Sequence, residues 1–146
     1  MDLGLKGKVA LVMASSRGLG QAMAVSLARE GVKVAVTGRN AEGLKKSVEL
    51  IEAAGGKALA LSWDLSDSSV IDSLVTKVEQ ELGPIDILIN NTGGPPPTLA
   101  TGQDPALWQK SFNDMVLSLI SITDRVLPGM RQRKWGRIIT STTSGA

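Results

Sequence analysis

The segment Val9–Gly20 reads VALVMASSRGLG, an apolar run followed directly by a turn with two glycines. The run Val9–Met13 is apolar on every residue, which is typical of a strand buried on both faces of a parallel sheet. Beyond the turn, apolar residues recur at helical spacing at Leu19, Met23 and Leu27, so we expect this stripe to pack on the sheet. Glycine permits a tight strand-to-helix turn, and the free amides at the helix N-terminus bind pyrophosphate. The segment therefore predicts the first strand, turn and helix of a dinucleotide-binding fold.

Four further apolar runs alternate with segments of helical periodicity, which is the pattern of an α/β protein. The runs are Lys33–Thr37, Lys57–Leu61, Ile85–Asn90 and Arg137–Thr142, and they too are predicted to be buried on both faces. We predict one domain over residues 1–146, with a Rossmann-like, doubly wound parallel sheet in a three-layer α/β/α arrangement. The common order of this fold uses six strands. Because five are present, we expect the chain to be truncated just after the fifth strand.

The longest helical segment is predicted from Asp104 to Met130 and carries two adjacent apolar stripes. One stripe contains Trp108, Phe112, Met115 and Leu119, and the other contains Val116, Ile120 and Leu127. A sheet contact needs only one stripe, so the second predicts another packing partner, most simply a second copy of the chain. A single buried helix in a monomer is the alternative.

Composition excludes several classes of site. The 146 residues are 42% apolar and 21% charged, enough for one domain with a sizeable core. The absence of Cys and His excludes disulfides, thiolate or His-based metal sites and the Ser-His-Asp arrangement, so no metal is predicted. A net charge of +2 does not favour nucleic acid. No apolar run approaches the roughly 20 residues of a membrane span. We expect a cytoplasmic protein with a small-molecule ligand.

The basic segment Arg131–Arg137 contains one aromatic residue, Trp135, and could in principle contact nucleic acid. We interpret it instead as a helix C-terminus, where basic side chains face the negative end of the helix dipole.

The end of the second strand predicts the cofactor preference. About 20 residues after the glycine-rich turn, where an acidic residue would bind the ribose of NAD, the sequence has Thr37-Gly38-Arg39. Arg39, together with Arg17 in the turn, could pair with a 2′-phosphate through charge-assisted hydrogen bonds. These residues therefore predict NADP(H) rather than NAD(H). Two solvated surface arginines are the alternative.

Four motifs, in order, resemble the short-chain dehydrogenase/reductase family, and in particular its 3-oxoacyl-[acyl-carrier-protein] reductases. The turn Ala14-Ser15-Ser16-Arg17-Gly18-Leu19-Gly20 is similar to the family's Gly-x-x-x-Gly-x-Gly motif. Trp63-Asp64-Leu65 resembles its adenine-contacting segment, and Asn90-Asn91-Thr92-Gly93 resembles its Asn-Asn-Ala-Gly motif. Residues 128–139 resemble the approach to its fifth strand.

The resemblance implies an oxidoreductase that transfers hydride between a nicotinamide cofactor and a carbonyl or acyl substrate, with fatty acid biosynthesis as one setting. Asp64 and Leu65 would lie near the adenine, and Asn90 near a cofactor ribose. The implied cofactor-binding residues are Ala14, Ser15, Ser16, Arg17, Gly18, Leu19, Gly20, Arg39, Asp64, Leu65, Asn90, Thr92 and Gly93.

The chain departs from the family pattern at two cofactor-side positions. Ala14 replaces the first glycine of the turn, and we expect it to keep a negative φ, where alanine is tolerated. A strained turn that holds the cofactor less well is the alternative. Met115 stands where the family has a helical Asn, and we interpret it as part of the apolar stripe.

The third departure concerns catalysis. The family's Tyr-x-x-x-Lys pair would fall beyond the end of this sequence, which contains no Tyr. The family's catalytic Ser corresponds to Thr143, although Ser141 and Ser144 leave the register open. We therefore expect cofactor binding without turnover by the chain alone. A non-catalytic nucleotide-binding or regulatory protein is the alternative function.

Overall fold

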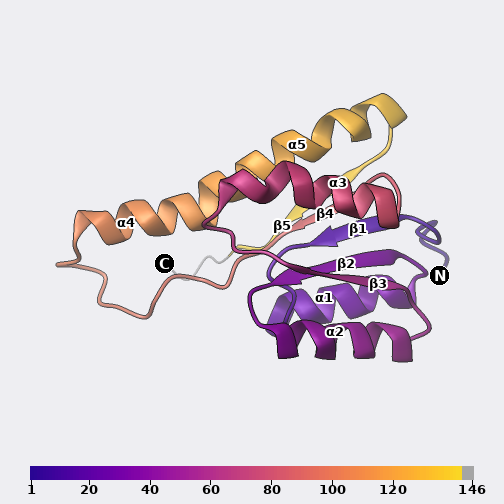
Figure 1. Ribbon diagram of the computed structural model, residues 1–146, viewed down its shortest axis with the longest axis horizontal. Helices are drawn as coiled ribbons and strands as arrows, with labels where there is room; N and C mark the ends of the chain where they lie inside the picture. Colours follow the sequence, from indigo (N-terminus) through magenta and orange to yellow (C-terminus); the bar gives the residue numbers. More distant parts are fainter. Residues whose placement is uncertain (143–146) are drawn as a thin grey trace.

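Five parallel strands form one sheet in the order β3-β2-β1-β4-β5 (Figure 1). The computed structural model describes residues 1–142. The strands are β1 (Val9–Val12), β2 (Lys33–Gly38), β3 (Ala58–Ser62), β4 (Ile87–Asn90) and β5 (Arg137–Thr140). Their bounds differ from the predicted ones by at most two residues. The predicted α/β class and doubly wound parallel sheet are confirmed.

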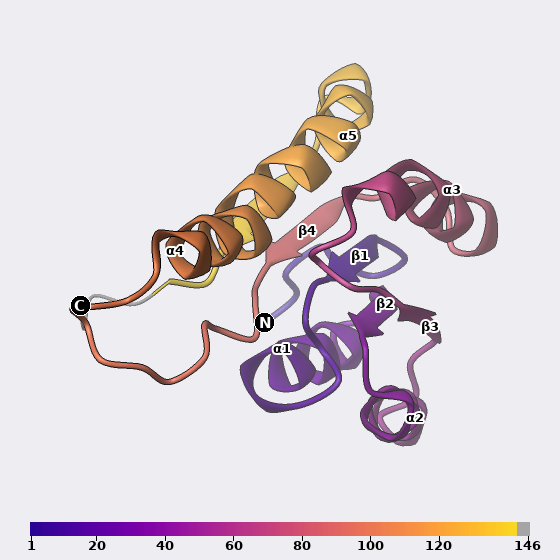
Figure 2. The same cartoon turned by 60° about the vertical axis from the view of Figure 1, so that its left-hand side comes forward.

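Helices cover both faces of this sheet (Figures 1 and 2). Helices α1 (Gly18–Arg29) and α2 (Ala41–Ala53) lie on one face, and α3 (Ile71–Glu81) and α5 (Ser118–Arg133) lie on the other. The side chains of β1 alternate between the two resulting cores: Val9 and Leu11 belong to one, Ala10 and Val12 to the other. The apolar run of β1 is thus explained by burial on both faces.

Helix α1 packs mainly through small residues; of the predicted stripe, Met23 and Leu27 are partly buried against the same core, but Leu19 is not. Leu19 is 71% exposed, whereas Gly20, Ala24 and Ala28 are buried. A Cβ at Gly20 would lie 2.2 Å from the carbonyl oxygen of Ala14, so the helix approaches the turn too closely for a larger residue. The expectation for Leu19 was wrong because close approach, and not side-chain volume, selects the buried face here.

The long helix predicted from Asp104 to Met130 is one rod with a π-helical turn inside it (Figure 2). It comprises α4 (Pro105–Phe112), the π turn η2 (Asn113–Leu117) and α5, and it ends at Arg133. Leu119 is buried, but Trp108 and Phe112 are 63% and 55% exposed. The predicted stripe assumed an uninterrupted α-helix, whereas a π turn inserts an extra residue and rotates the residues before it relative to those after it. Of the four residues of the stripe, only Leu119 belongs to the core.

Strand β5 also differs from its prediction. All four residues of Arg137–Thr140 are exposed. The strand pairs with β4 only, and among residues 1–142 no element lies at its other edge. The apolar residues Ile138 and Ile139 correctly predicted a strand, but the prediction that this strand is buried on both faces was wrong.

The basic segment after α5 makes internal contacts. Arg131 and Arg133 lie in the last turn of α5, where the helix dipole favours cations. The Nη2 atom of Arg133 donates a 2.7 Å hydrogen bond to the carbonyl oxygen of Ile85. Trp135 contacts two cations, with Lys8 Nζ 4.2 Å and Arg137 Cζ 4.8 Å from its ring centre. These contacts hold the end of the helix against the sheet.

Within residues 1–142, no helix combines the length and apolar character needed to cross a bilayer.

Candidate functional site

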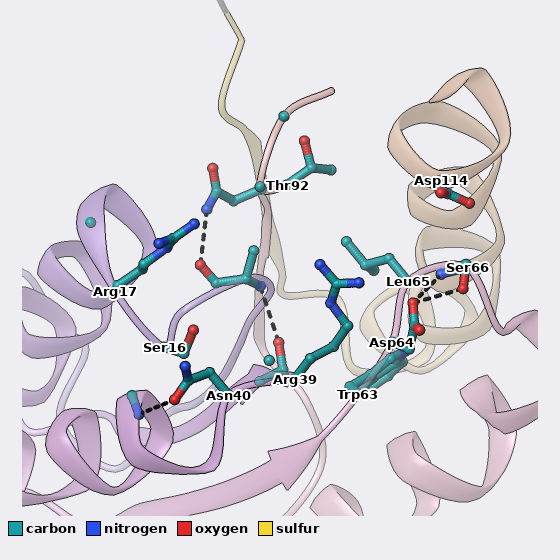
Figure 3. A pocket seen from close by; sticks show the side chains of 18 of the residues that line it. Ser16, Arg17, Arg39, Asn40, Trp63, Asp64, Leu65, Ser66, Thr92 and Asp114 are labelled. Atoms are coloured by element: carbon teal, nitrogen blue, oxygen red, sulfur yellow. Dashed lines mark hydrogen bonds between the residues drawn. The ribbon is translucent and has the colours of Figure 1, made fainter. Parts of the chain in front are cut away.

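A cavity of about 980 Å³ opens at the carboxyl ends of β1, β2, β3 and β4 (Figure 3). In a doubly wound sheet this edge is where ligands bind, at the point where the strand order reverses. Here that point lies between β1 and β4, because the chain passes outward from β1 to β3 and then returns to β4. The volume lies near the upper end of the range for small-molecule and cofactor sites.

The turn after β1 forms one wall, and its backbone is strained at Ala14. Ala14 has φ +47°, so the expectation of a negative φ was wrong. The chain reverses so sharply after β1 that the Ala14 amide donates to Thr37 Oγ1 at 3.1 Å, while its carbonyl oxygen accepts from Asn91 Nδ2 at 3.3 Å. The left-handed conformation costs an alanine roughly 1–2 kcal/mol. Gly18, in the same turn, has φ +58°, which glycine adopts without strain.

Buried hydroxyls hold this turn in place. Ser15 is fully buried; its Oγ accepts from the Thr37 amide at 2.8 Å and donates to the carbonyl of Val12 at 2.8 Å. Ser47 on α2 donates to the carbonyl oxygen of Ser15 at 2.7 Å. Gln21 donates to Ser47 Oγ at 2.9 Å. Ser15 therefore positions the turn from beneath and does not line the cavity.

The N-terminus of α1 lacks a side-chain cap. Arg17 stands at the N-cap position and no side chain accepts a hydrogen bond from the first turn. In contrast, Asn40 caps α2, Asp67 caps the 3₁₀ turn η1 (Ser68–Val70) that leads into α3, and Asp104 caps α4. The amides of α1 thus face the cavity without an internal acceptor. This end of α1 is the arrangement that binds phosphate oxygens.

The cavity contains more basic than acidic groups. Four basic and three acidic side chains line it, and the Lys110 ammonium pairs with Asp114. Among residues 1–142, Arg17, Arg39 and Lys46 form no ion pair. Figure 3 shows Arg17 extending from the α1 side and Arg39 from the end of β2. Unpaired cations beside an uncapped helix N-terminus favour an anionic ligand.

Asp64 and Leu65 form the opposite wall, after β3. Asp64 Oδ1 accepts hydrogen bonds from the Ser66 amide at 2.9 Å and from Ser66 Oγ at 2.7 Å (Figure 3). The Ser66 amide, then the Ser66 hydroxyl, and the nearby Arg39 guanidinium lower the pKa of Asp64. The carboxylate therefore stays ionised and is an acceptor for a ligand amine. Trp63, beside it, is buried, and its indole Nε1 has no hydrogen-bond partner among the described residues.

The segment after β4 contributes Asn91, Thr92, Gly93 and Gly94 to the cavity. Asn91 Nδ2 donates to the carbonyl oxygens of Met13 and Ala14, so this amide ties β4 to the turn after β1. Asn90 is directed away from the cavity, because its Nδ2 donates to Thr123 Oγ1 of α5 at 3.0 Å.

The structure brings together most of the residues that the sequence indicated. Those that line the cavity are Ala14, Ser16, Arg17, Gly18, Leu19, Arg39, Asp64, Leu65, Thr92 and Gly93. Ser15, Gly20 and Asn90 support the walls without lining them, and Thr143 lies outside the described residues. Among the described residues, no cluster of three or more acidic side chains is placed to hold a metal ion.

Sequence reasoning missed Lys46 and Asn91. Lys46 lies one turn after Gly43 on α2, and a Cβ at Gly43 would lie 2.7 Å from the carbonyl oxygen of Ser16. A glycine in the first turn of a helix was the available signal that α2 approaches the glycine-rich turn. Asn91 belongs to the motif Asn90-Asn91-Thr92-Gly93, but nothing in the sequence indicates which of the two Asn side chains points toward the turn after β1.

An uncapped helix, unpaired cations and an ionised carboxylate at the switch point of a parallel sheet are features of the doubly wound α/β fold class whose members bind dinucleotides at this edge. A sequence model of the short chain dehydrogenase family matches residues 8–146. The chain belongs to this family.

Two curated relatives illustrate the match. Ketoacyl reductase HetN of Nostoc sp. is 37% identical over 135 residues, which cover 92% of this chain and 47% of that protein. The 3-oxoacyl-[acyl-carrier-protein] reductase FabG of Pseudomonas aeruginosa is 36% identical over 137 residues, which cover 94% of this chain and 56% of that protein. The chain spans about half the length of these relatives.

Solved structures agree with the fold. L-sorbose reductase from Gluconobacter frateurii, complexed with NADPH and L-sorbose, superposes with a TM-score of 0.88 at 31% identity over 96% of this chain and 54% of that one. A metagenomic short-chain oxidoreductase in complex with NADP superposes with a TM-score of 0.85 at 33% identity. The match covers 97% of this chain and 66% of that one.

Proposed function

We propose that this chain binds NADP(H) as the cofactor-binding portion of a carbonyl/alcohol oxidoreductase. The observation that carries the proposal is the group of unpaired cations, Arg17, Arg39 and Lys46, around the uncapped N-terminus of α1. A nicotinamide cofactor fits this cavity, and two structural relatives are described as complexes with NADPH or NADP.

The residues divide the cofactor among the walls of the cavity. The amides at the start of α1 would bind the pyrophosphate, and Asp64 would accept from the adenine amine while Leu65 would pack against the ring. Arg39, at the end of β2, would pair with the 2′-phosphate. Thr92 and Gly93, after β4, would hold the nicotinamide end. When bound, the cofactor supplies or accepts hydride at the substrate carbon.

The proton is the part of the reaction that this chain does not handle alone. A carbonyl that receives hydride also needs an acid, and the sequence has no Tyr to match the family's acid. By resemblance Thr143, or Ser141 or Ser144 in another register, would supply the family's hydroxyl, which is not an acid of suitable pKa. We therefore propose that the chain as given binds cofactor without useful turnover.

The substrate class is a carbonyl or its alcohol. The relatives include proteins named as a ketoacyl reductase, a 2,3-dihydro-2,3-dihydroxybenzoate dehydrogenase and an L-sorbose reductase. Within that class we propose a 3-oxoacyl group, because relatives named for that activity match at 33–36% identity.

Calorimetric titration with NADPH and NADH tests the proposal. We expect NADPH to bind at least about tenfold tighter, because a charge-assisted contact contributes roughly 1.5–3 kcal/mol. Arg39→Ala should remove the preference, whereas Arg29→Ala, an exposed arginine at the far end of α1, should leave it intact. Equal affinity for the two cofactors would contradict NADP(H) specificity. No binding of either would contradict the proposed function.

A turnover assay separates the two functional classes. Mixing the chain with NADPH and acetoacetyl-CoA should give no steady oxidation. Steady oxidation that Gly18→Trp abolishes would show that another residue supplies the proton.

A further inference from the structure

A second cavity, of about 540 Å³, lies between α4 and the segment that connects β4 to α4. Its walls are mainly apolar, and no charged side chain lines it. We call it the α4 groove; its principal residues are Pro95, Pro97, Leu107, Trp108, Phe112 and Met115. The volume suits part of a small ligand.

The α4 groove adjoins the cofactor cavity. Met115 lines both cavities. The connecting segment also passes from one to the other, because Asn91–Gly94 line the first and Pro95–Ala100 line the second. A molecule whose carbonyl lay at the Thr92–Gly93 end of the cofactor cavity could therefore extend past Met115 into the groove.

The outer wall of the α4 groove is held in a fixed shape. Three consecutive prolines at Pro95–Pro97 restrict the backbone. Gln103 Nε2 donates to the carbonyl oxygens of Leu99 at 3.0 Å and Thr101 at 3.4 Å, which closes the segment on itself. Asp104 then caps α4 through the Ala106 amide at 2.9 Å. A pre-shaped wall lowers the entropic cost of binding a ligand.

The inner wall presents aromatic surface to solvent. Trp108 and Phe112 lie one turn apart on α4 and are more than half exposed. Aromatic rings pack well on other rings and on the thioether of a Met such as Met115. An ionised group here would lose its hydration without gaining a charged partner.

We propose that the α4 groove binds an uncharged aromatic substituent of the carbonyl substrate, with Phe112 and Trp108 as its specificity-determining residues. The proposal rests on the proposed function for the identity of the ligand as a carbonyl compound, but the groove itself can be tested without cofactor.

The test follows indole N–H signals by NMR, since the chain has three Trp residues in three environments. Trp108 lines the α4 groove, Trp63 lines the cofactor cavity and Trp135 lines neither. Acetophenone should shift the Trp108 signal in a saturable way and leave Trp135 unchanged. The charged analogue 4-acetylbenzoate should bind at least about tenfold more weakly.

Phe112→Ala should weaken acetophenone binding about tenfold, as expected for losing an apolar contact in a pocket. Leu3→Ala is the matched control, because Leu3 is 54% exposed, close to the 55% of Phe112, and lies outside both the groove and the rod. Unchanged Trp63 and Trp135 signals in both variants verify the fold.

Three results would overturn the proposal. They are a Trp108 signal that acetophenone does not shift, an affinity for 4-acetylbenzoate equal to that for acetophenone, and an affinity for acetophenone that Phe112→Ala leaves unchanged. A titration with NADPH, followed by the indole signal of Trp63, distinguishes failure of the groove proposal from failure of the proposed function. Loss of the NADPH response with acetophenone binding retained would refute only the cofactor proposal.

Discussion

Strands β1 and β5 are both four-residue parallel strands of the same sheet, yet their burial is opposite. Every residue of β1 is buried, between β2 and β4 and beneath helices on both faces. Every residue of β5 is exposed, and the strand pairs with β4 alone. An apolar run therefore specifies a strand, while its burial depends on neighbours that the run does not encode.

The same contrast divides the molecule into two regions. The interior region, from β1 to β4, forms most of the cavity at the carboxyl ends of the strands and most of both cores. The exposed region comprises α4, the π turn, the first turn of α5 and β5, and it carries Trp108, Phe112, Ile120 and Ile139 at its surface.

The largest effect is expected from truncation inside β1. Leu11→Ala should lower the free energy of unfolding by about 3 kcal/mol, because a fully buried leucine leaves a cavity. Ile139→Ala, in β5, should cost less than about 1 kcal/mol, because its side chain is 53% exposed. Urea unfolding monitored by circular dichroism gives both values. Similar losses would mean that β5 is covered in solution.

The exposed region should associate. We propose that the outward face of the rod around Leu117 and Ile120 forms a two-fold contact between chains, since monomers seldom leave such a patch bare. Ile120→Glu should weaken association at least about tenfold, roughly 1.4 kcal/mol, in light scattering at micromolar concentration. Leu119 is buried, so a substitution there would disturb the core and would not test the contact between chains.

The control for association is Leu3→Glu, at an exposed residue outside the rod. It should leave the mass unchanged. A wild-type monomer would refute the proposal, and a dimer insensitive to Ile120→Glu would place the contact elsewhere.

A smaller gain is expected at the end of β1. Ala14→Gly should raise the free energy of unfolding by about 0.5–1 kcal/mol, since glycine relieves the positive φ and offsets part of this gain through its unfolded-state entropy. Thermal unfolding measures the shift, with Ala24→Gly as the destabilising counterpart in the buried face of α1. Loss of stability in Ala14→Gly would contradict the strain at this turn.

The smallest effect is pH-dependent. Because hydrogen bonds from Ser66 lower the pKa of Asp64 in the folded state, its contribution to stability is present above the unfolded pKa of about 3.8 and is lost as pH falls through the lower folded value. Asp64→Asn should therefore flatten the stability profile slightly below pH 4. The effect is small because Asp64 is exposed. A steeper profile in the variant would contradict the direction of the shift.

Sequence patterns predicted the fold well because the strands and the glycine-rich turn are local. The five apolar runs and the turn at Ala14–Gly20 were found at nearly the observed positions. The buried face of α1 and the φ of Ala14 were not, since both depend on the close approach of α1, the turn and Asn91. Lys46 was missed for a similar reason, because α2 also approaches the turn closely. The π turn at Asn113–Leu117 was not predicted either, because the sequence pattern was interpreted as an uninterrupted α-helix.

The central claim is that the cavity of the interior region binds NADP(H), and amide hydrogen exchange with and without saturating NADPH tests it most directly. The account predicts slower exchange at Gly18–Gly20 and at Asp64–Ser66, with no change at Arg137–Thr140, and a weaker response to NADH at the same concentration. Unchanged exchange at both cavity segments in the presence of NADPH would contradict it.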